Sequence, residues 1–138
     1  MSERFLFGEE HVRRYQETDG DEGYEWREGS HILLLTTTGR RTGQKHTTPL
    51  IFGLEGDNPV IVASKGGAPQ HPGWYRNLVK TPAAEVQIKG EKFSVRARDA
   101  EGEERERLWK MMNGEWPHYD EYAQKTDRVI PVVVLERG

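Results

Sequence analysis

The sequence contains no cysteine, which excludes disulfide bonds, thiolate metal sites and cysteine nucleophiles. No window approaches the ~18 consecutive apolar residues that a membrane-spanning helix needs. The N-terminus, MSERFLFGEEHVRRY, carries too much charge for a secretory signal peptide. Together these absences predict a cytoplasmic protein.

The signatures of several enzyme classes are also missing. The chain has no GxSxG, no Walker A and no GxGxxG pattern, so hydrolytic triads and the standard nucleotide-binding loops find no support. Its histidines are scattered and form no HExxH pair, so we expect no metal. They are His11, His31, His46, His71 and His118.

Charge is plentiful but unevenly distributed. The 138 residues, enough for one domain, have a net charge of −3. Residues 32–98 hold ten Lys or Arg against four Asp or Glu, whereas residues 1–31 and 99–138 are net acidic. A basic cleft in an acidic protein suits a small anionic ligand. Nucleic acid is not expected as a partner, because the acidic flanks would repel a long phosphate backbone.

Apolar patterning predicts a mainly β fold. Proline favours an edge position or a bulge for the strand that contains Pro49, and an edge position for the strand that contains Pro131. Gly90-Glu91 suits a tight hairpin turn, and Gly114 is a natural helix C-cap. Because the gaps between strands are too short for crossover helices, we expect a small antiparallel β-barrel with peripheral helices. Strands are expected at 32–38, 47–54, 60–64, 85–89, 91–99 and 129–135, and helices at 72–79, 103–113 and 116–126.

The N-terminal residues form an extension in this interpretation. Weak helical periodicity marks residues 5–17, and the Gly- and acid-rich stretch 18–30 is typical of a loop. We therefore divide the chain into a helix and loop extension, 1–30, and a single barrel domain, 31–138. A solvated helix packed on the barrel is the simplest interpretation of 5–17. The alternatives are a lid and peripheral contact with a membrane surface, although membrane-surface helices have a basic polar face and this one is mixed.

Two Gly-rich basic loops follow predicted strands. In Gly39-Arg-Arg-Thr-Gly43 the glycines allow backbone amides to approach an anion, and the arginines can fork onto phosphate oxygens. Ser64-Lys-Gly-Gly67 repeats the arrangement after the third predicted strand. A solvated hairpin turn would need the same glycines. Two such loops facing one mouth of a barrel favour a phosphate-bearing ligand.

Aromatic side chains follow both loops in the sequence. Gly73-Trp-Tyr-Arg-Asn77 offers two rings that could cover a planar cofactor. Tyr119 and Tyr122, three residues apart, share one face of a short predicted helix, and a phenol there could position a carbonyl or nitro oxygen. The alternative for both segments is that the rings anchor their helices to the core.

Three stretches are similar to motifs of the deazaflavin-dependent nitroreductase and quinone reductase family. They are LLLTTTGRRTGQKHTTPL, VASKGGAPQHPGWYRNL and YDEYAQKTDRVIPVVVLE. The resemblance runs from about Leu33 to Glu136. It implies a split β-barrel of the FMN-binding, pyridoxamine-oxidase-like type with antiparallel Greek-key strands. It also implies binding of coenzyme F420, an 8-hydroxy-5-deazaflavin, and hydride transfer to a quinone, a nitro-compound or a conjugated enone.

The resemblance further implies roles for individual residues. Tyr119, with Trp116 and Tyr122 beside it, would orient the small-molecule electron acceptor. An FMN-dependent split-barrel reductase and a non-catalytic carrier of the coenzyme remain alternatives, and the oligomeric state does not follow from the sequence. The expected cofactor-binding residues are Arg40, Arg41, Thr42, His46, Thr47, Thr48, Pro49, Leu50, Ile51, Val62, Ala63, Ser64, Lys65, Gly73, Trp74, Tyr75, Arg76, Asn77 and Tyr119.

Overall fold

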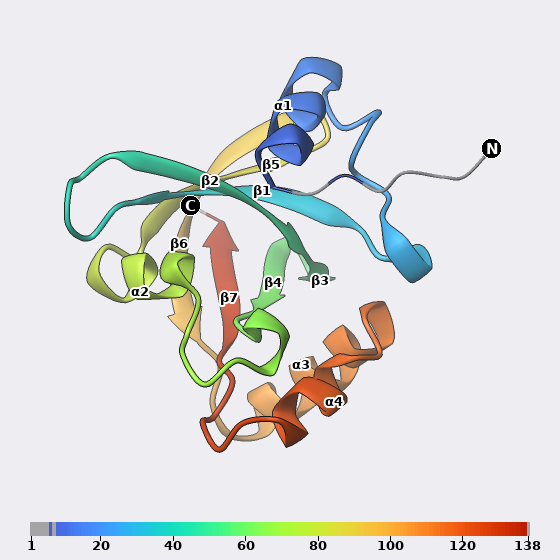
Figure 1. The fold of residues 1–138 in the computed structure, drawn as a ribbon, viewed down its shortest axis with the longest axis vertical. Coiled ribbons are helices and arrows are strands. Elements are labelled where there is room, and N and C mark those ends of the chain that lie inside the picture. Colours follow the sequence, from blue (N-terminus) through green and yellow to red (C-terminus); the bar gives the residue numbers. More distant parts are fainter. Residues whose placement is uncertain (1–5, 7, 138) are drawn as a thin grey trace.

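The computed structural model describes residue 6 and residues 8–137 and contains one curled antiparallel sheet (Figure 1). Its seven strands pair in the order β2-β1-β5-β6-β7-β4-β3. β2 and β3 stand at opposite ends of this order, yet only Phe52 separates them in the chain, so the sheet must curl into a barrel. The prediction of a mainly β fold is confirmed. The strands are β1 (Ile32–Thr38), β2 (Lys45–Ile51), β3 (Gly53–Glu55), β4 (Asn58–Val62), β5 (Ala83–Ile88), β6 (Glu91–Asp99) and β7 (Val132–Arg137).

The helices are peripheral, as predicted: α1, α3 and α4 pack on the outer face of the sheet, and α2 contributes Trp74 and Leu78 to the core inside the barrel. Figure 1 shows α1 beside β1 and β2, with α3 and α4 at the other end of the molecule near β3 and β4. Two short 3-10 turns, η1 and η2, lie in the loops. The elements are α1 (Gly8–Thr18), η1 (Arg27–Gly29), η2 (Lys65–Gly67), α2 (Gly73–Lys80), α3 (Gly102–Glu115) and α4 (Tyr119–Gln124).

Strand β1 is buried on both faces, which explains its unbroken apolar run. Successive side chains of a strand point to opposite faces of the sheet. Leu33 and Leu35 therefore pack in the barrel interior, while Ile32 and Leu34 pack against Tyr15 of α1. A third apolar cluster lies between the barrel and the helices α3 and α4. The barrel thus has a core inside it and a further apolar layer on each helix-covered side.

The two edge-strand predictions based on proline have different outcomes. Pro49 lies in β2, a strand at the end of the sheet order, so its edge prediction is confirmed. The predicted strand 47–54 is, however, broken at Phe52 into β2 and β3. The edge prediction from Pro131 is wrong, because β7 lies between β6 and β4. Pro131 precedes the first residue of β7, so its missing N–H leaves no gap in the ladder.

Two predicted termini also differ from the structure. Gly114 is not a C-cap, because α3 continues to Glu115 and the N–H of Trp116 still donates to the Met112 carbonyl at 2.9 Å. The turn between β5 and β6 is at Lys89-Gly90 instead of Gly90-Glu91. Lys89 adopts a φ of +54°, and its N–H donates to the Tyr15 hydroxyl at 2.8 Å. A long-range contact therefore fixes this turn.

The described part of the N-terminal extension packs on the barrel. α1 begins at Gly8, and its Tyr15 side chain is fully buried. His11 Nε2 lies 2.8 Å from the Gly23 carbonyl oxygen, which fixes the following loop. Residues 5 and 7 of the predicted helix, together with residues 1–4, lie outside the described residues. Peripheral membrane contact stays a prediction.

None of the helices in the described ranges combines the length and the apolar character needed to cross a membrane.

Candidate active site

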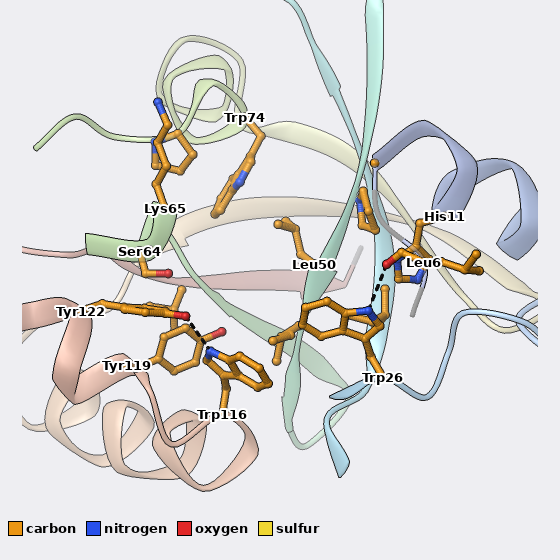
Figure 2. A pocket seen from close by; sticks show the side chains of 17 residues that line it. Leu6, His11, Trp26, Leu50, Ser64, Lys65, Trp74, Trp116, Tyr119 and Tyr122 are labelled. Atoms are coloured by element: carbon orange, nitrogen blue, oxygen red, sulfur yellow. Dashed lines mark hydrogen bonds between the residues drawn. The ribbon is translucent and has the colours of Figure 1, made fainter. Parts of the chain in front are cut away.

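A cavity of about 360 Å³ opens between the barrel, the N-terminal segment and α4. We call it the aromatic pocket. Figure 2 shows Trp116, Tyr119 and Tyr122 grouped beside Ser64, with Trp26, His11 and Leu6 on the other side of Leu50. Sequence-predicted residues that line it are Pro49, Leu50, Ile51, Val62, Ser64, Lys65, Trp74, Trp116, Tyr119 and Tyr122.

A second cavity of about 520 Å³ lies beside the β1–β2 turn. We call it the basic pocket. Trp74 lines both cavities, so the two adjoin at this residue, and we call them together the cleft. One part is therefore apolar and aromatic, and the other is polar and basic. The sequence-predicted residues of the basic pocket are Arg40, Arg41, Thr42, His46, Thr48, Gly73, Trp74 and Asn77.

The two arginines of the GRRTG turn differ in their surroundings. The Arg40 guanidinium donates to the Asn77 side-chain oxygen at 2.9 Å, and the backbone N–H of Arg40 donates to the same oxygen. Asn77 in turn donates to the Thr37 hydroxyl at 3.1 Å. Arg40 thus ties the turn to α2. Arg41 is exposed and makes no hydrogen bond or ion pair with any of residues 6 and 8–137.

The η2 loop follows β4 at the border of the aromatic pocket. Ser64 is in the right-handed helical region (φ −79°, ψ −39°), and Lys65, at φ +47°, is in the left-handed region. This pairing of conformations directs successive backbone N–H groups to one side, an arrangement that binds anions. Figure 2 shows the Lys65 amine pointing away from Tyr119 and Tyr122. The loop thus contributes backbone and the Ser64 side chain to the pocket.

The two tyrosines of α4 have different hydrogen bonds. The Tyr122 hydroxyl accepts from the indole N–H of Trp116 at 3.2 Å. Among the described residues the Tyr119 hydroxyl makes no hydrogen bond, although the residue is only 4 % exposed. Burial raises the pKa of Tyr119, and Tyr122 and Glu115 raise this pKa further. Tyr119 is therefore a protonated phenol with an unused donor at the aromatic pocket.

Four predicted site residues line neither pocket. Thr47 points to the other face of β2, where its hydroxyl lies 2.7 Å from that of Thr36. Ala63 is buried in the barrel core. The Tyr75 hydroxyl donates to Asp99 at 2.7 Å. Arg76 lies on the exposed side of α2. Alternation along the strand and helix explains these placements, because neighbours in sequence face different sides.

Sequence reasoning missed the contribution of the N-terminal segment. Trp26 lines the aromatic pocket, and its ring centroid lies 5.5 Å from that of Trp116. The indole N–H of Trp26 donates to the Leu6 carbonyl at 3.0 Å. The available signal was a large aromatic residue in an otherwise polar loop. The other missed lining residues are Leu6, Gly8, His11, Ile32, Gly66 and Pro72.

Solved structures support the fold of the chain. A structure of an F420-H2 dependent reductase is 45% identical, with a TM-score of 0.71, over 76% of this chain and 93% of the other. The heme storage protein HutZ of Vibrio cholerae is 16% identical, with a TM-score of 0.61, over 96% of this chain and 92% of the other. At that identity HutZ supports the fold alone. The prediction of a split β-barrel is confirmed.

The family is established by sequence. A family model described as F420H(2)-dependent quinone reductase matches residues 7–137, which includes most of the N-terminal extension. An F420H(2)-dependent quinone reductase of Mycobacterium tuberculosis is 40% identical over 130 residues, covering 92% of this chain and 87% of the relative. The motifs around the two Gly-rich loops and α4 thus led to the right group of proteins, and the chain belongs to the F420H(2)-dependent quinone reductase family.

Proposed function

We propose that the cleft binds reduced coenzyme F420 and that the chain transfers its hydride to a quinone held in the aromatic pocket. The observation that carries this proposal is that the basic and aromatic pockets adjoin at Trp74, which lines both. A deazaflavin has a planar ring at one end and a phosphate-bearing tail at the other. The cleft offers a chemically matched surface to each end.

The basic pocket fits the phosphate tail. Arg41 and Thr42 are exposed at its rim, and the Arg41 guanidinium has no competing carboxylate among the described residues. A free guanidinium can bind phosphate oxygens in a bidentate manner. Arg40 and Asn77 would hold the turn in place. Binding energy from the tail would then position the remote ring.

The aromatic pocket fits the ring and the acceptor. The side chains of Leu50 and Trp74 present apolar surface to a planar group. When bound, the reduced coenzyme supplies a hydride, and the carbon that replaces a flavin nitrogen disfavours one-electron and oxygen chemistry. The protein's own tasks are binding, orientation and exclusion of water. Trp26 and Trp116 would exclude water from the side opposite α2.

Tyr119 is proposed to orient the acceptor. Its hydroxyl is an unused donor, and its raised pKa keeps it protonated across neutral pH. A quinone carbonyl oxygen that accepts this hydrogen bond gains negative charge as the hydride arrives, so the bond strengthens in the transition state. Tyr122 and Trp116, bonded to each other, would shape the pocket around the acceptor.

Steady-state oxidation of reduced coenzyme F420 by menadione tests this proposal. The wild-type protein should catalyse the reaction, and Arg41→Ala should raise the KM for the coenzyme. Arg96→Ala removes an exposed arginine of β6 outside both pockets and is the matched control, so its KM should equal that of the wild type. Coenzyme binding without turnover with any quinone would instead support the carrier alternative.

A further inference from the structure

The guanidinium of Arg128, in the segment between α4 and β7, contacts only the loop that follows β4 in its hydrogen bonds with described residues. It donates to the carbonyls of Ala68 (2.9 Å), Ala63 (3.1 Å) and Ser64 (2.7 Å). Its Nη1 also lies 3.1 Å from His71 Nδ1. No carboxylate of the described residues forms an ion pair with it. We propose that Arg128 is a positioning residue that fixes the cofactor-side loop against the acceptor-side helix, an inference that rests on the proposed function.

The chemistry of these contacts favours a geometric role. Arginine usually pairs with carboxylate or phosphate, where charge compensates the loss of water. Here the acceptors are neutral, and burial lowers the pKa of Arg128. The rigid fork of a guanidinium can reach three carbonyls at once. A lysine amine carries all its N–H donors on one nitrogen and cannot span the same carbonyls. The fork therefore sets the relative positions of residues 63, 64 and 68.

The loop that Arg128 fixes has a backbone that requires support. Lys65, Gly66 and Gly67 have φ values of +47°, +63° and +85° in succession. A lysine in this region is strained, and such conformations persist where surrounding structure determines them. The Ser64 carbonyl accepts from both Arg128 and the N–H of Gly67, the latter at 3.0 Å. Arg128 thus anchors the start of the left-handed run.

The same loop lies directly on α4. A Cβ atom added at Gly67 would stand 2.8 Å from the Tyr122 carbonyl oxygen and 3.0 Å from the Lys125 Cβ. Ser64 of the loop and Tyr119 of α4 form neighbouring walls of the aromatic pocket, which the proposed function assigns to the cofactor and to the acceptor. The contact at Gly67 and the bonds of Arg128 together determine the separation of these walls. Hydride transfer is sensitive to that separation, since a displacement of ~1 Å can reduce a rate by about 100-fold.

His71 extends the connection toward α2. Its Nδ1 accepts from Arg128, so the ring carries its proton on Nε2. Burial lowers the pKa of His71, and the charges of Arg128 and Arg76 lower it further, although Asp99 raises it. The next residue, Pro72, is the N-cap of α2 and lines the aromatic pocket. One guanidinium therefore reaches both ends of the loop between β4 and α2.

The decisive variants are Arg128→Gln and Arg128→Lys, with Arg105→Gln as the matched control. Arg105 also donates to a carbonyl, that of Ile130 at 2.6 Å, but among the described residues it makes no hydrogen bond to the loop. The first measurement is amide hydrogen exchange of the protein without coenzyme. Both Arg128 variants should speed exchange at Gly67 and Ala68 by about tenfold or more while β5 and β6 keep wild-type rates. Arg105→Gln should leave the loop unchanged.

The second measurement separates positioning from a purely structural role. The single-turnover rate of menadione reduction by the loaded protein should fall about 10–100-fold in Arg128→Lys, with a smaller rise in the Kd for the coenzyme. Loop exchange at the wild-type rate in both Arg128 variants would overturn the inference. So would faster exchange with unchanged turnover and Kd, because the loop geometry would then not matter for the reaction. If the wild type binds no coenzyme, the proposed function fails, and loop exchange still decides whether Arg128 fixes the loop.

Discussion

The Nε2 atom of His118 lies 2.7 Å from a carboxylate oxygen of Glu28, and the Nδ1 atom of the same ring lies 3.2 Å from Glu121. Glu28 belongs to η1 of the N-terminal segment, and His118 is the N-cap of α4. The pair joins the two segments that contribute Trp26 and Trp116 to the aromatic pocket. Attachment of the N-terminal segment should therefore depend on pH.

The expected dependence follows from the pKa of His118. Its hydrogen bond with Glu28, and then that with Glu121, raises this pKa above its ordinary value. A group whose pKa is raised in the folded state stabilises the fold below its unfolded pKa of ~6.5, and this contribution is lost as pH rises through the folded pKa. His118→Gln should therefore lower the Tm more at pH 6 than at pH 9, measured by differential scanning fluorimetry. If the Tm of the variant differed from that of the wild type by the same amount at every pH, the His118–Glu28 pair would not contribute to stability. Glu28→Gln should give the same profile.

Arg40 and Arg41 should respond differently to substitution. Arg41→Ala should weaken coenzyme binding about tenfold or more, the effect of losing hydrogen bonds to a charged group, and should leave the Tm unchanged. Arg40→Ala should lower the Tm, because it removes the bond to Asn77. Fluorescence titration and thermal unfolding measure the two effects. Equal loss of affinity in both variants without a change in Tm would contradict this division.

Tyr119→Phe tests the unused phenol. Removing the hydroxyl should reduce kcat with menadione by about 100-fold, the lower end of the range for proton-donor effects, and should not change the Kd for the coenzyme. Tyr122→Phe is the matched comparison and should have a smaller effect, because the Tyr122 hydroxyl already accepts from Trp116. Unchanged kcat in Tyr119→Phe would assign acceptor orientation to another group.

Tyr15→Phe should destabilise the fold without touching the cleft. The buried Tyr15 hydroxyl donates to the Ile32 carbonyl at 2.9 Å and accepts from the Lys89 N–H at 2.8 Å. Burial raises the pKa of this phenol to about 12. Loss of the hydroxyl leaves buried groups unpaired, at a cost of about 1–3 kcal/mol, measurable by urea unfolding. Tyr75→Phe removes a bond to exposed Asp99 and should cost less. If Tyr15→Phe lowered the free energy of unfolding no more than Tyr75→Phe, the result would contradict this account.

The apolar pattern of the sequence predicted the strands of the barrel well, because it reflects which faces of each strand are buried. The bounds of β1 and β6 agree with the prediction, since a buried run and an alternating run each lie between turn residues. The Pro131 interpretation failed because the same residue can start an internal strand or interrupt an edge strand. Which applies depends on strand order, and order is set by contacts between distant segments.

The candidate site was predictable where its residues lie in motifs. The loops at Gly39–Gly43 and Ser64–Gly67 could be found because glycine and basic residues together indicate anion binding. Trp26 and Arg128 could not be found in this way. Their roles arise from the topology, which brings residue 26 to residue 116 and residue 128 to residue 64. The spacing of residues along the sequence does not predict those contacts.

The most direct test is a fluorescence titration of the purified protein with coenzyme F420 and with FMN, side by side at the same ionic strength. Saturable quenching by the deazaflavin is expected, weakened by salt and by Arg41→Ala, with weaker binding of FMN. Absence of binding of both redox forms of the deazaflavin, or tighter binding of FMN, would contradict the assignment of the two pockets.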